Sequence, residues 1–377
     1  MAKKKELEKL DIKELNKKLG EYTFQRAERN EDGTIRTPRY LTGIVLFDML
    51  LNGGLPQGKI VAIGSEPGIG KTTLLVNACG NIATSKPDKR IYYIDVEGGA
   101  SYELWDDMGF SHLLYDPEGN PSGNIYLMNR AKSIQSIAKI CKVVLSDPDT
   151  ALVIIDSDTA VTDDNLLLEE DLGTSKNAVG ANARLWSAAI RPINALVTNS
   201  NACMIIVHQA RVDISGWMPV VESAGGNAIK HVASVEIWGK RKGWIAADNT
   251  ITKKKEEAVG ALMQLQTKKN RLTVPFAAVT VPVIFGRGIS NKLAYKLWLE
   301  NHGIEDSVTG EVTPYINWGK SGYGDFRLSS TFTPIKFRGE AECWNLVEKY
   351  YDQVVALVDS SGGFTLERAD DDDEATE

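Results

Sequence analysis

A glycine-rich segment between an apolar run and a helix-like run constrains the fold of this chain more than any other feature. The segment is Gly64-Ser65-Glu66-Pro67-Gly68-Ile69-Gly70-Lys71-Thr72-Thr73, and it follows the apolar run Ile60–Ile63. In such a loop the backbone N–H groups turn toward one point, and the next helix adds the partial positive charge of its N-terminus. Because the loop needs a strand before it and a helix after it, the pattern predicts a phosphate site in an α/β fold.

The residue types in this loop have distinct chemical roles. We expect Lys71 to neutralise the β and γ phosphates of ATP, and the Thr72 hydroxyl to ligate Mg²⁺. The usual motif begins with glycine, whereas this chain has Ser65 there and Gly64 one residue earlier, and a small residue still permits the turn. The predicted nucleotide contacts of the loop are Ser65, Glu66, Pro67, Gly68, Ile69, Gly70, Lys71, Thr72 and Thr73.

From about Tyr40 onward, short apolar runs alternate with longer amphipathic stretches, which is typical of a mostly parallel sheet covered by helices. The expected buried strands are Ile60–Ile63, Ile91–Val96, Ile125–Met128, Leu152–Ile155 and Cys203–Val207. Helices are expected around Ile134–Val144 and over Ala181–Thr198. Three later runs alternate more strongly and are expected to extend the sheet in antiparallel fashion: Val232–Trp238, Ala261–Gln266 and Ala277–Phe285.

Two of the expected strands end in carboxylates. The strand Leu152–Ile155 leads into Asp156, which is predicted to hold Mg²⁺ through its water shell. Hydrolysis also needs a group that orients the attacking water. Glu97, after the strand Ile91–Val96, is the predicted residue, although a glutamate in such a loop is commonly only solvated.

The ends of the chain differ in composition from its middle. Residues 1–35 combine a Lys-rich amphipathic helix with a polar linker and are expected to form a docking arm. The expected core spans residues 36–286 and a small C-terminal domain spans 287–369. The tail 370–377 holds six acids and no base, and accounts for most of the formal charge of −7. It is expected to be either a solvated end or a mobile anionic segment that competes with DNA.

Cysteine spacing and hydropathy narrow the class of protein further. Cys79, Cys141, Cys203 and Cys343 are far apart, so neither a disulfide framework nor a zinc site is indicated. No stretch approaches the roughly 20 apolar residues of a membrane span. We therefore expect a soluble, cytoplasmic protein that has no membrane partner.

From about Thr42 to Gly288 the chain resembles the RecA family of recombination ATPases. Gly53-Gly54-Leu55-Pro56-Gln57-Gly58-Lys59 is similar to the family's approach to the phosphate loop, and Pro67–Lys71 is closer to the RadA branch. Asp95-Val96-Glu97 resembles the family's catalytic-glutamate segment. The resemblance implies a RecA-like ATPase core and a catalytic role for Glu97, and it suggests that Tyr102 stacks on adenine.

Two further motifs imply how ATP would be sensed. His208-Gln209-Ala210-Arg211 resembles the family's Asn-Gln-x-Arg, in which the glutamine senses the γ-phosphate, so Gln209 is expected to do so here. Here His208 replaces the family's asparagine. Lys268-Lys269-Asn270-Arg271 resembles a segment whose two cations reach the ATP of a neighbouring protomer, which implies that Lys269 and Arg271 act across an interface.

The resemblance also implies a DNA-binding surface. A first DNA loop is expected near Glu169–Asn177, and a second from Val212 to Ala224, closed by Gly225–Lys230. The basic cluster Lys240–Lys242 is either a guide for duplex DNA or a solvated strand end. The expected DNA contacts are Arg184, Arg191, Arg211, Trp217, Met218, Gly225, Gly226, Asn227 and Lys230.

Taken as a family member, the chain is expected to be an ATP-dependent recombinase. It would form filaments with itself on single-stranded DNA and pair that strand with a homologous duplex, with single-strand-binding and loader proteins as possible partners. One alternative is a ring helicase or branch-migration ATPase on the same core. Another is a non-catalytic filament mediator, against which the presence of both Glu97 and Gln209 counts.

Overall fold

The computed structural model describes residues 37–116, 123–131, 133–159, 161, 178–213, 220–223, 227–361 and 363–368. The chain divides into two units, Met1–Pro38 and Arg39–Glu377, and the second contains every element described below. The predicted N-terminal helix, the first DNA loop and the acidic tail lie outside the described residues.

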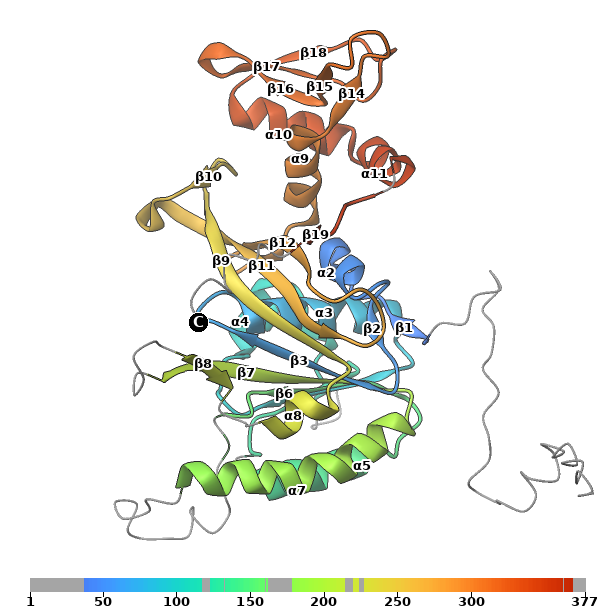
Figure 1. Cartoon of the computed structure of the whole chain (residues 1–377), viewed down its shortest axis with the longest axis vertical. Helices are drawn as coiled ribbons and strands as arrows, with labels where there is room; N and C mark the ends of the chain where they lie inside the picture. The colour runs from blue at the N-terminus through green and yellow to red at the C-terminus, as the bar shows by residue number, and fades with distance from the viewer. Residues whose placement is uncertain are drawn as a thin grey trace, which may run out of the picture. The chain divides into compact units, whose positions relative to one another are not determined.

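A large mixed sheet forms the centre of the second unit (Figure 1). Its strand order is β13-β12-β11-β9-β3-β7-β6-β4-β5, with β8, β10 and β19 pairing on its sides. The strands are β3 (Lys59–Ser65), β4 (Arg90–Asp95), β5 (Ile125–Met128), β6 (Thr150–Asp156), β7 (Cys203–Asp213), β8 (Val220–Ser223), β9 (Val235–Ala246), β10 (Ile251–Thr252), β11 (Ala258–Asn270), β12 (Ala277–Ile284), β13 (Gly288–Ile289) and β19 (Glu367–Arg368). The expected α/β fold with a mostly parallel central sheet is confirmed.

The transition from parallel to antiparallel pairing occurs one strand later than expected. The strand β9, which was expected to join the sheet in antiparallel fashion, pairs parallel with β3, and its antiparallel partners are β11 and the short β10. The helix α8 (Asn227–Val232) explains the difference. It turns the chain back before β9, so that β9 starts at the same edge as β3, whereas β9, β11 and β12 follow one another as hairpins.

Helices cover both faces of this sheet. The helices α2 (Val45–Leu50), α3 (Lys71–Ser85) and α4 (Tyr102–Asp107) pack with one set of strand residues, such as Val61 and Ile63. The helices α5 (Ile134–Val144), α7 (Ala178–Thr198) and α8 pack with the alternate set, such as Ile60 and Ala62. Successive strand residues therefore face different layers, as period-two geometry requires for a strand buried on both sides. Among the described residues, no helix is both long and apolar enough to cross a membrane.

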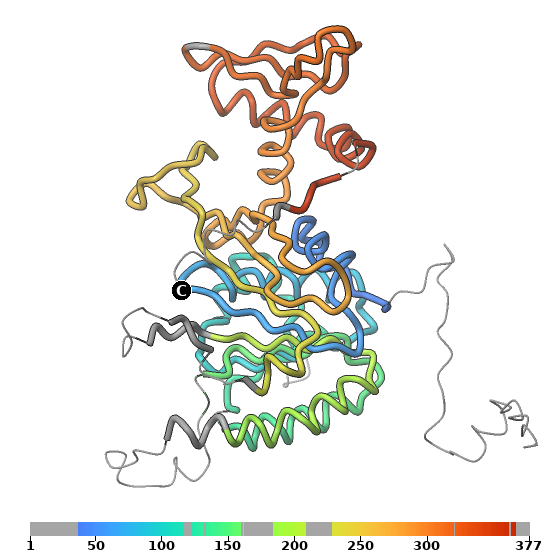
Figure 2. The backbone as a smooth tube through the Cα atoms, in the orientation of Figure 1, coloured from blue at the N-terminus to red at the C-terminus, as the bar shows by residue number. Residues whose placement is uncertain are grey.

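A smaller C-terminal part has its own apolar cluster, which includes Trp298, Phe326, Phe337 and Val354. Its elements are α9 (Asn291–Asn301), β14 (Gly303–Glu305), β15 (Val312–Pro314), β16 (Ile316–Trp318), β17 (Tyr323–Phe326), β18 (Ile335–Arg338), α10 (Gly339–Lys349) and α11 (Tyr351–Ser360). After α11 the chain returns to the core, as the backbone trace in Figure 2 shows, and β19 pairs with β12. The remaining short elements are β1 (Arg39–Tyr40), β2 (Leu55–Pro56) and the 3₁₀ turns Ser111–Leu113, Lys255–Glu257 and Lys320–Gly322.

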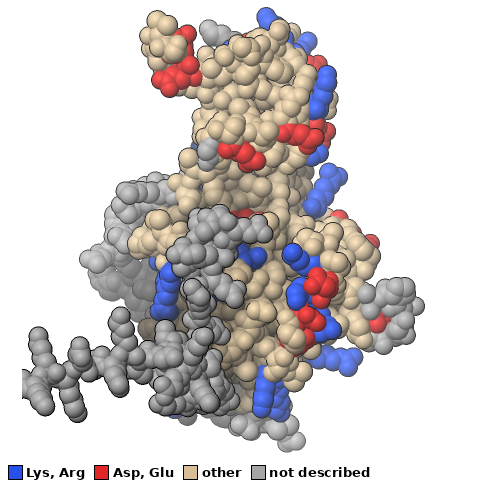
Figure 3. Space-filling view, turned by 90° about the vertical axis from the view of Figure 1, so that its right-hand side faces the viewer, with Lys and Arg blue, Asp and Glu red and all other residues tan. Residues whose placement is uncertain are grey.

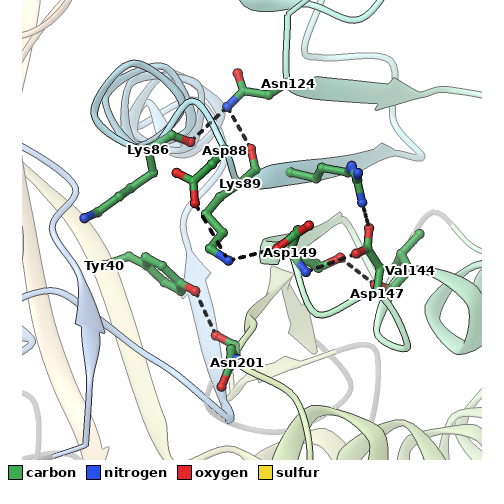
Figure 4. A network of polar contacts seen from close by, with 11 residues as sticks. Tyr40, Lys86, Asp88, Lys89, Asn124, Val144, Asp147, Asp149 and Asn201 are labelled. Atoms are coloured by element: carbon green, nitrogen blue, oxygen red, sulfur yellow. Dashed lines mark hydrogen bonds and ion pairs between the residues drawn. The ribbon is translucent and has the colours of Figure 1, made fainter.

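At the amino ends of the parallel strands, a network of polar contacts ties the connections together (Figure 4). The Lys89 ammonium lies 3.1 Å from Asp149, and the Asn124 side-chain amide donates to the carbonyls of Lys86 at 3.2 Å and of Lys89 at 2.8 Å. Arg90 pairs with Asp147 beside them. The polar groups at the amino ends of these strands therefore have hydrogen-bond partners within the chain. The polar residues of the predicted site lie at the carboxyl ends of the strands.

Candidate nucleotide-binding site

Three parallel strands of the central sheet, β3, β6 and β4, place polar residues at their carboxyl ends, where α/β sheets bind ligands. Ser65 ends β3, Asp95 ends β4 and Asp156 ends β6, and Asp95 pairs in register with Asp156. All three residues are buried. The predicted phosphate loop and the two predicted acidic segments therefore converge at one edge.

The phosphate loop is held in shape by glycine conformations and by one apolar anchor. Gly70 has a φ of 103° and forms the N-cap of α3, a conformation that costs glycine little. Ile69 is buried against Gly239 of β9, where an added Cβ atom would lie 2.6 Å from the Ile69 Cδ1 atom. The close approach of β9 thus fixes the loop from the side.

Lys71 folds back over the loop. Its Nζ atom donates to the Ser65 Oγ atom at 2.7 Å and to the Glu66 carbonyl at 3.3 Å. Burial lowers the pKa of Lys71, while the charges of Asp156 and Glu97 act in the opposite direction. The Lys71 ammonium therefore lies beside the phosphate loop and is hydrogen-bonded to two uncharged groups, which a phosphate oxygen can replace.

Asp156 is held by two hydroxyl groups. Its Oδ2 atom accepts from the Tyr93 hydroxyl at 2.7 Å and from the Thr72 Oγ1 atom at 3.1 Å. Burial raises the pKa of Asp156, and the nearby charges of Glu97 and Asp95 raise it further, while the hydrogen bonds from Tyr93 and Thr72 lower it. The two residues predicted to ligate Mg²⁺, Thr72 and Asp156, are thus in direct contact.

Glu97 lies on a turn that is built by Asp95 (β4). The Asp95 carboxylate accepts from the backbone N–H groups of Gly98 at 2.8 Å and Ala100 at 2.9 Å. The Glu97 carboxylate is exposed and accepts from the Ser157 hydroxyl, while the Glu97 N–H donates to the Asp156 carbonyl at 3.3 Å. Glu97 is consequently fixed beside Asp156 but open to solvent, as a water-orienting group must be.

Sequence reasoning assigned no role to two polar contacts at this edge. The hydroxyl groups of Tyr93 and Ser157 orient Asp156 and Glu97, respectively. The available signal for Tyr93 was its place two residues before Asp95 on a buried strand, since a buried tyrosine hydroxyl needs a partner. No comparable signal marks Ser157.

A second buried pair lies beside the site. The His208 Nδ1 atom is 2.7 Å from the Asp158 Oδ2 atom, and both residues are buried. The family resemblance had marked His208 only as a replacement of asparagine. The structure supplies its partner, which is an aspartate at the end of the neighbouring strand.

The two predicted interface cations rest on α8. The Lys269 Nζ atom donates to the carbonyls of Lys230 at 2.6 Å and His231 at 3.2 Å, and the Arg271 guanidinium donates to the His231 carbonyl at 3.3 Å. Burial lowers the pKa of Lys269, and the neighbouring Arg271 lowers it further. Within this single chain, the two cations therefore bind the C-terminal carbonyls of the helix that follows the second predicted DNA loop.

The other predicted residues are distributed as follows. Tyr102 is 62% exposed at the start of α4, where its ring is accessible to a base. Arg184 and Arg191 are exposed on α7. The Cα atom of Gln209 pairs in register with that of Ser65, and Arg211 pairs with Glu222. Of the remaining predicted DNA contacts, Asn227 and Lys230 belong to α8, whereas Trp217, Met218, Gly225 and Gly226 lie outside the described residues.

The donor set fits a magnesium nucleotide. The groups at the strand ends are a hydroxyl and carboxylates, which are hard oxygen ligands of the kind that Mg²⁺ uses together with phosphate oxygens. Among the described residues, no group of three or more His, Cys, Asp or Glu side chains could hold a metal ion. Thr72 and Asp156, which are in direct contact, would hold a magnesium ion here together with the phosphates of its nucleotide.

The fold and this site define a P-loop nucleotide-binding protein with a RecA-like core. The family model of the RecA N-terminal domain matches residues 5–290, so the chain belongs to the RecA family.

Individual relatives are distant. The chain is 29% identical to "Protein RecA" of Mannheimia haemolytica over 265 residues, which cover 70% of this chain and 66% of that protein. It is 26% identical to "Protein RecA" of Sulfurovum sp. (strain NBC37-1) over 336 residues, 88% of each chain. The crystal structure of the RadB recombinase is similar at 19% identity and a TM-score of 0.45, covering 66% of this chain and 98% of that one.

Proposed function

We propose that the protein is an ATP-dependent recombinase that assembles on single-stranded DNA and pairs it with a homologous duplex. The observation that carries the proposal is the convergence of Lys71, Thr72, Asp156 and Glu97 at the carboxyl ends of the parallel strands β3, β6 and β4. The membership of the RecA family, whose relatives above bear the name RecA, supports the same assignment.

The residues of the site divide the work of hydrolysis. Magnesium-bound ATP supplies a γ-phosphate activated for transfer to water. Lys71 exchanges its neutral partners for phosphate oxygens, and Thr72 and Asp156 hold the ion. Glu97, oriented by Ser157, accepts a hydrogen bond from the attacking water. Tyr102 offers its exposed ring to the adenine.

The interface cations would couple ATP to assembly. Lys269 and Arg271 would leave the carbonyls of α8 and bind the γ-phosphate of the ATP on a neighbouring protomer, so that ATP joins the two protomers. The two cations would also stabilise the negative charge that develops on the γ-phosphate during hydrolysis. Gln209, in register with the phosphate loop, would report the γ-phosphate to the second DNA loop. The exposed Arg184 and Arg191 would contact DNA phosphates, so DNA affinity should fall with salt.

The surroundings of the protein are also part of the proposal. All four cysteines are buried and unpaired, which fits the reducing cytoplasm. On the face shown in Figure 3, acidic and basic side chains are interspersed over the described residues. Single-strand-binding and loader proteins are the expected accessory partners.

The proposal is tested by electron microscopy of the protein with single-stranded DNA and a slowly hydrolysed ATP analogue. Open helical filaments are expected, because each ATP would be shared between neighbours. Closed rings with unwinding activity would instead favour a helicase. Unchanged monomers would contradict both assignments.

A matched set of variants tests the role of the interface cations. Lys269→Ala with Arg271→Ala should abolish ATP-dependent assembly and lower DNA-stimulated hydrolysis by about 10³-fold or more, the range known for cations acting in trans. Lys268→Ala is the control, because Lys268 is an exposed neighbour of the pair. Hydrolysis and assembly at wild-type levels in the double variant would refute the interface role.

A further inference from the structure

The side chain of Tyr93 lies in the middle of the nucleotide site without touching solvent. Tyr93 is fully buried on β4, and its ring packs edge-on against Trp105, with 5.9 Å between the ring centroids. Its hydroxyl donates to the Asp156 Oδ2 atom at 2.7 Å, across the pairing of β4 with β6. The contact is therefore made from the rigid interior of the sheet and not from a loop.

The geometry of this contact restricts the carboxylate. The Oδ2 atom of Asp156 receives hydrogen bonds from Tyr93 on the strand side and from Thr72 on the loop side. A Thr72 hydroxyl that ligated a metal ion through an oxygen lone pair would keep its proton for Asp156. Because Tyr93 belongs to the interior of the sheet, its hydrogen bond would hold the carboxylate from the side opposite the loop.

The hydrogen bond from Tyr93 also offsets part of the cost of placing a negative charge on the buried Asp156. Asp156 is buried, Asp95 pairs with it in register and the Glu97 N–H donates to its carbonyl, so a negative charge placed there is costly unless donors surround it. A hydrogen bond donated to the charged form offsets part of this cost. Toward an ionised carboxylate, the protonated Tyr93 hydroxyl acts as the hydrogen-bond donor.

We propose that Tyr93 is a positioning residue for the magnesium site, whose hydroxyl holds Asp156 in the orientation that binds the ion. The proposal rests on the proposed function, since it assumes that Asp156 holds the metal of a bound nucleotide. Tyr93 itself contacts neither the ion nor the nucleotide. It acts through Asp156, as outer-shell partners of metal ligands do.

The sequence of β4 provides a matched pair of variants. Tyr93→Phe removes one hydroxyl group and keeps the ring that packs on Trp105. Tyr92→Phe removes the same group from the adjacent residue, whose side chain lies on the other face of the strand and stacks on Tyr126 at 4.9 Å. Both variants lose one hydroxyl group, and the one lost in Tyr93→Phe is the donor to Asp156.

The experiment measures the affinity of the full-length protein for a fluorescent ADP analogue, as a function of Mg²⁺ and in EDTA. For Tyr93→Phe, the Mg²⁺ concentration that gives half of the metal-dependent gain in affinity should rise by about tenfold or more, as is typical when an outer-shell partner is lost. Affinity in EDTA should stay at the wild-type value. Tyr92→Phe should match the wild type in both conditions.

A double variant separates a specific effect from a general loss of structure. In an Asp156→Asn background, Tyr93→Phe should cause little further loss of magnesium-dependent affinity, because the carboxylate that it orients is gone. Additive losses, an equal loss in EDTA or an unchanged Mg²⁺ requirement would each overturn the positioning role. If the wild-type protein gained no affinity from Mg²⁺, the proposed function itself would fail.

Discussion

At the scale of single residues, hydroxyl groups orient the acidic residues of this site. Thr72 and Tyr93 donate to Asp156, and Ser157 donates to Glu97. A carboxylate among other carboxylates is costly to ionise in a buried place unless donors surround it. The hydroxyl donors meet that need without adding a second positive charge beside Lys71.

Glu97→Gln tests the residue that orients water. The variant keeps the size of the side chain but removes the negative charge that attracts the water proton, so steady-state ATP hydrolysis should fall by about 10²–10⁴-fold. Nucleotide affinity should change little. A phosphate-release assay measures ATP hydrolysis, and the binding of a fluorescent ADP analogue measures nucleotide affinity. Hydrolysis within threefold of the wild-type rate would exclude Glu97 from this role.

The buried His208–Asp158 pair makes a prediction about stability. Asp158→Ala leaves the His208 Nδ1 atom without its 2.7 Å partner in a buried place, which should lower the free energy of unfolding by about 1–3 kcal/mol. Urea unfolding followed by circular dichroism measures the change. The double variant Asp158→Ala with His208→Ala should be less destabilised than the two separate losses together, and strict additivity would deny the coupling.

At the scale of elements, the approach of one strand to a loop decides the shape of the phosphate site. The strand β9 runs beside β3, and Gly239 lets Ile69 of the phosphate loop pack against its backbone. The helix α8 sets this arrangement, because it returns the chain so that β9 is parallel to β3. A single glycine on a neighbouring strand thus contributes to a site that it does not enter.

Gly239→Ala tests this packing. The new Cβ atom would lie 2.6 Å from the Ile69 Cδ1 atom and 3.0 Å from the Ser65 Cβ atom, so the Ile69 side chain must move and the loop loses its apolar anchor. An overpacking cost of about 1 kcal/mol would lower nucleotide affinity by about fivefold. Gly243→Ala is the control, because its nearest neighbour would be at 3.4 Å. Adding Ile69→Val to Gly239→Ala removes the Cδ1 atom that meets the new Cβ atom, so it should restore part of the nucleotide affinity. Equal nucleotide affinities of Gly239→Ala and Gly243→Ala would refute the packing argument.

At the scale of the whole molecule, buried charges connect the elements of the C-terminal part. Lys296 of α9 is 2% exposed, and its Nζ atom lies 2.7 Å from Glu300 and 3.1 Å from Glu340 of α10. Glu300 also accepts from the Trp318 indole of β16 at 2.8 Å. Burial alone would lower the pKa of Lys296, but the two carboxylates raise it, so the ammonium stays charged at neutral pH.

Lys296→Met tests how much this network contributes to the free energy of unfolding. The substitution leaves two carboxylates close together without their cation, and breaking a buried pair in this way typically costs about 3–5 kcal/mol of unfolding free energy. Lys292→Met is the control, because the Lys292–Glu348 pair is exposed and such pairs contribute about 0–1 kcal/mol. Urea unfolding compares the stabilities of the two variants. The folded Lys296→Met protein should still bind nucleotide. Equal unfolding midpoints for the two variants would argue against the network.

The sequence by itself determined the α/β fold, because strand runs and helical periodicity follow from the residues alone. It also predicted the phosphate loop, Asp156 and Glu97 as parts of one site, since a strand–glycine loop–helix pattern and acids at strand ends depend only on local chain order. Only the tertiary structure decided the parallel pairing of β9, the contact of Gly239 with Ile69 and the hydroxyl partners Tyr93 and Ser157. These features join residues far apart in the chain, and hydrogen bonds and packing across such distances depend on which strands become neighbours.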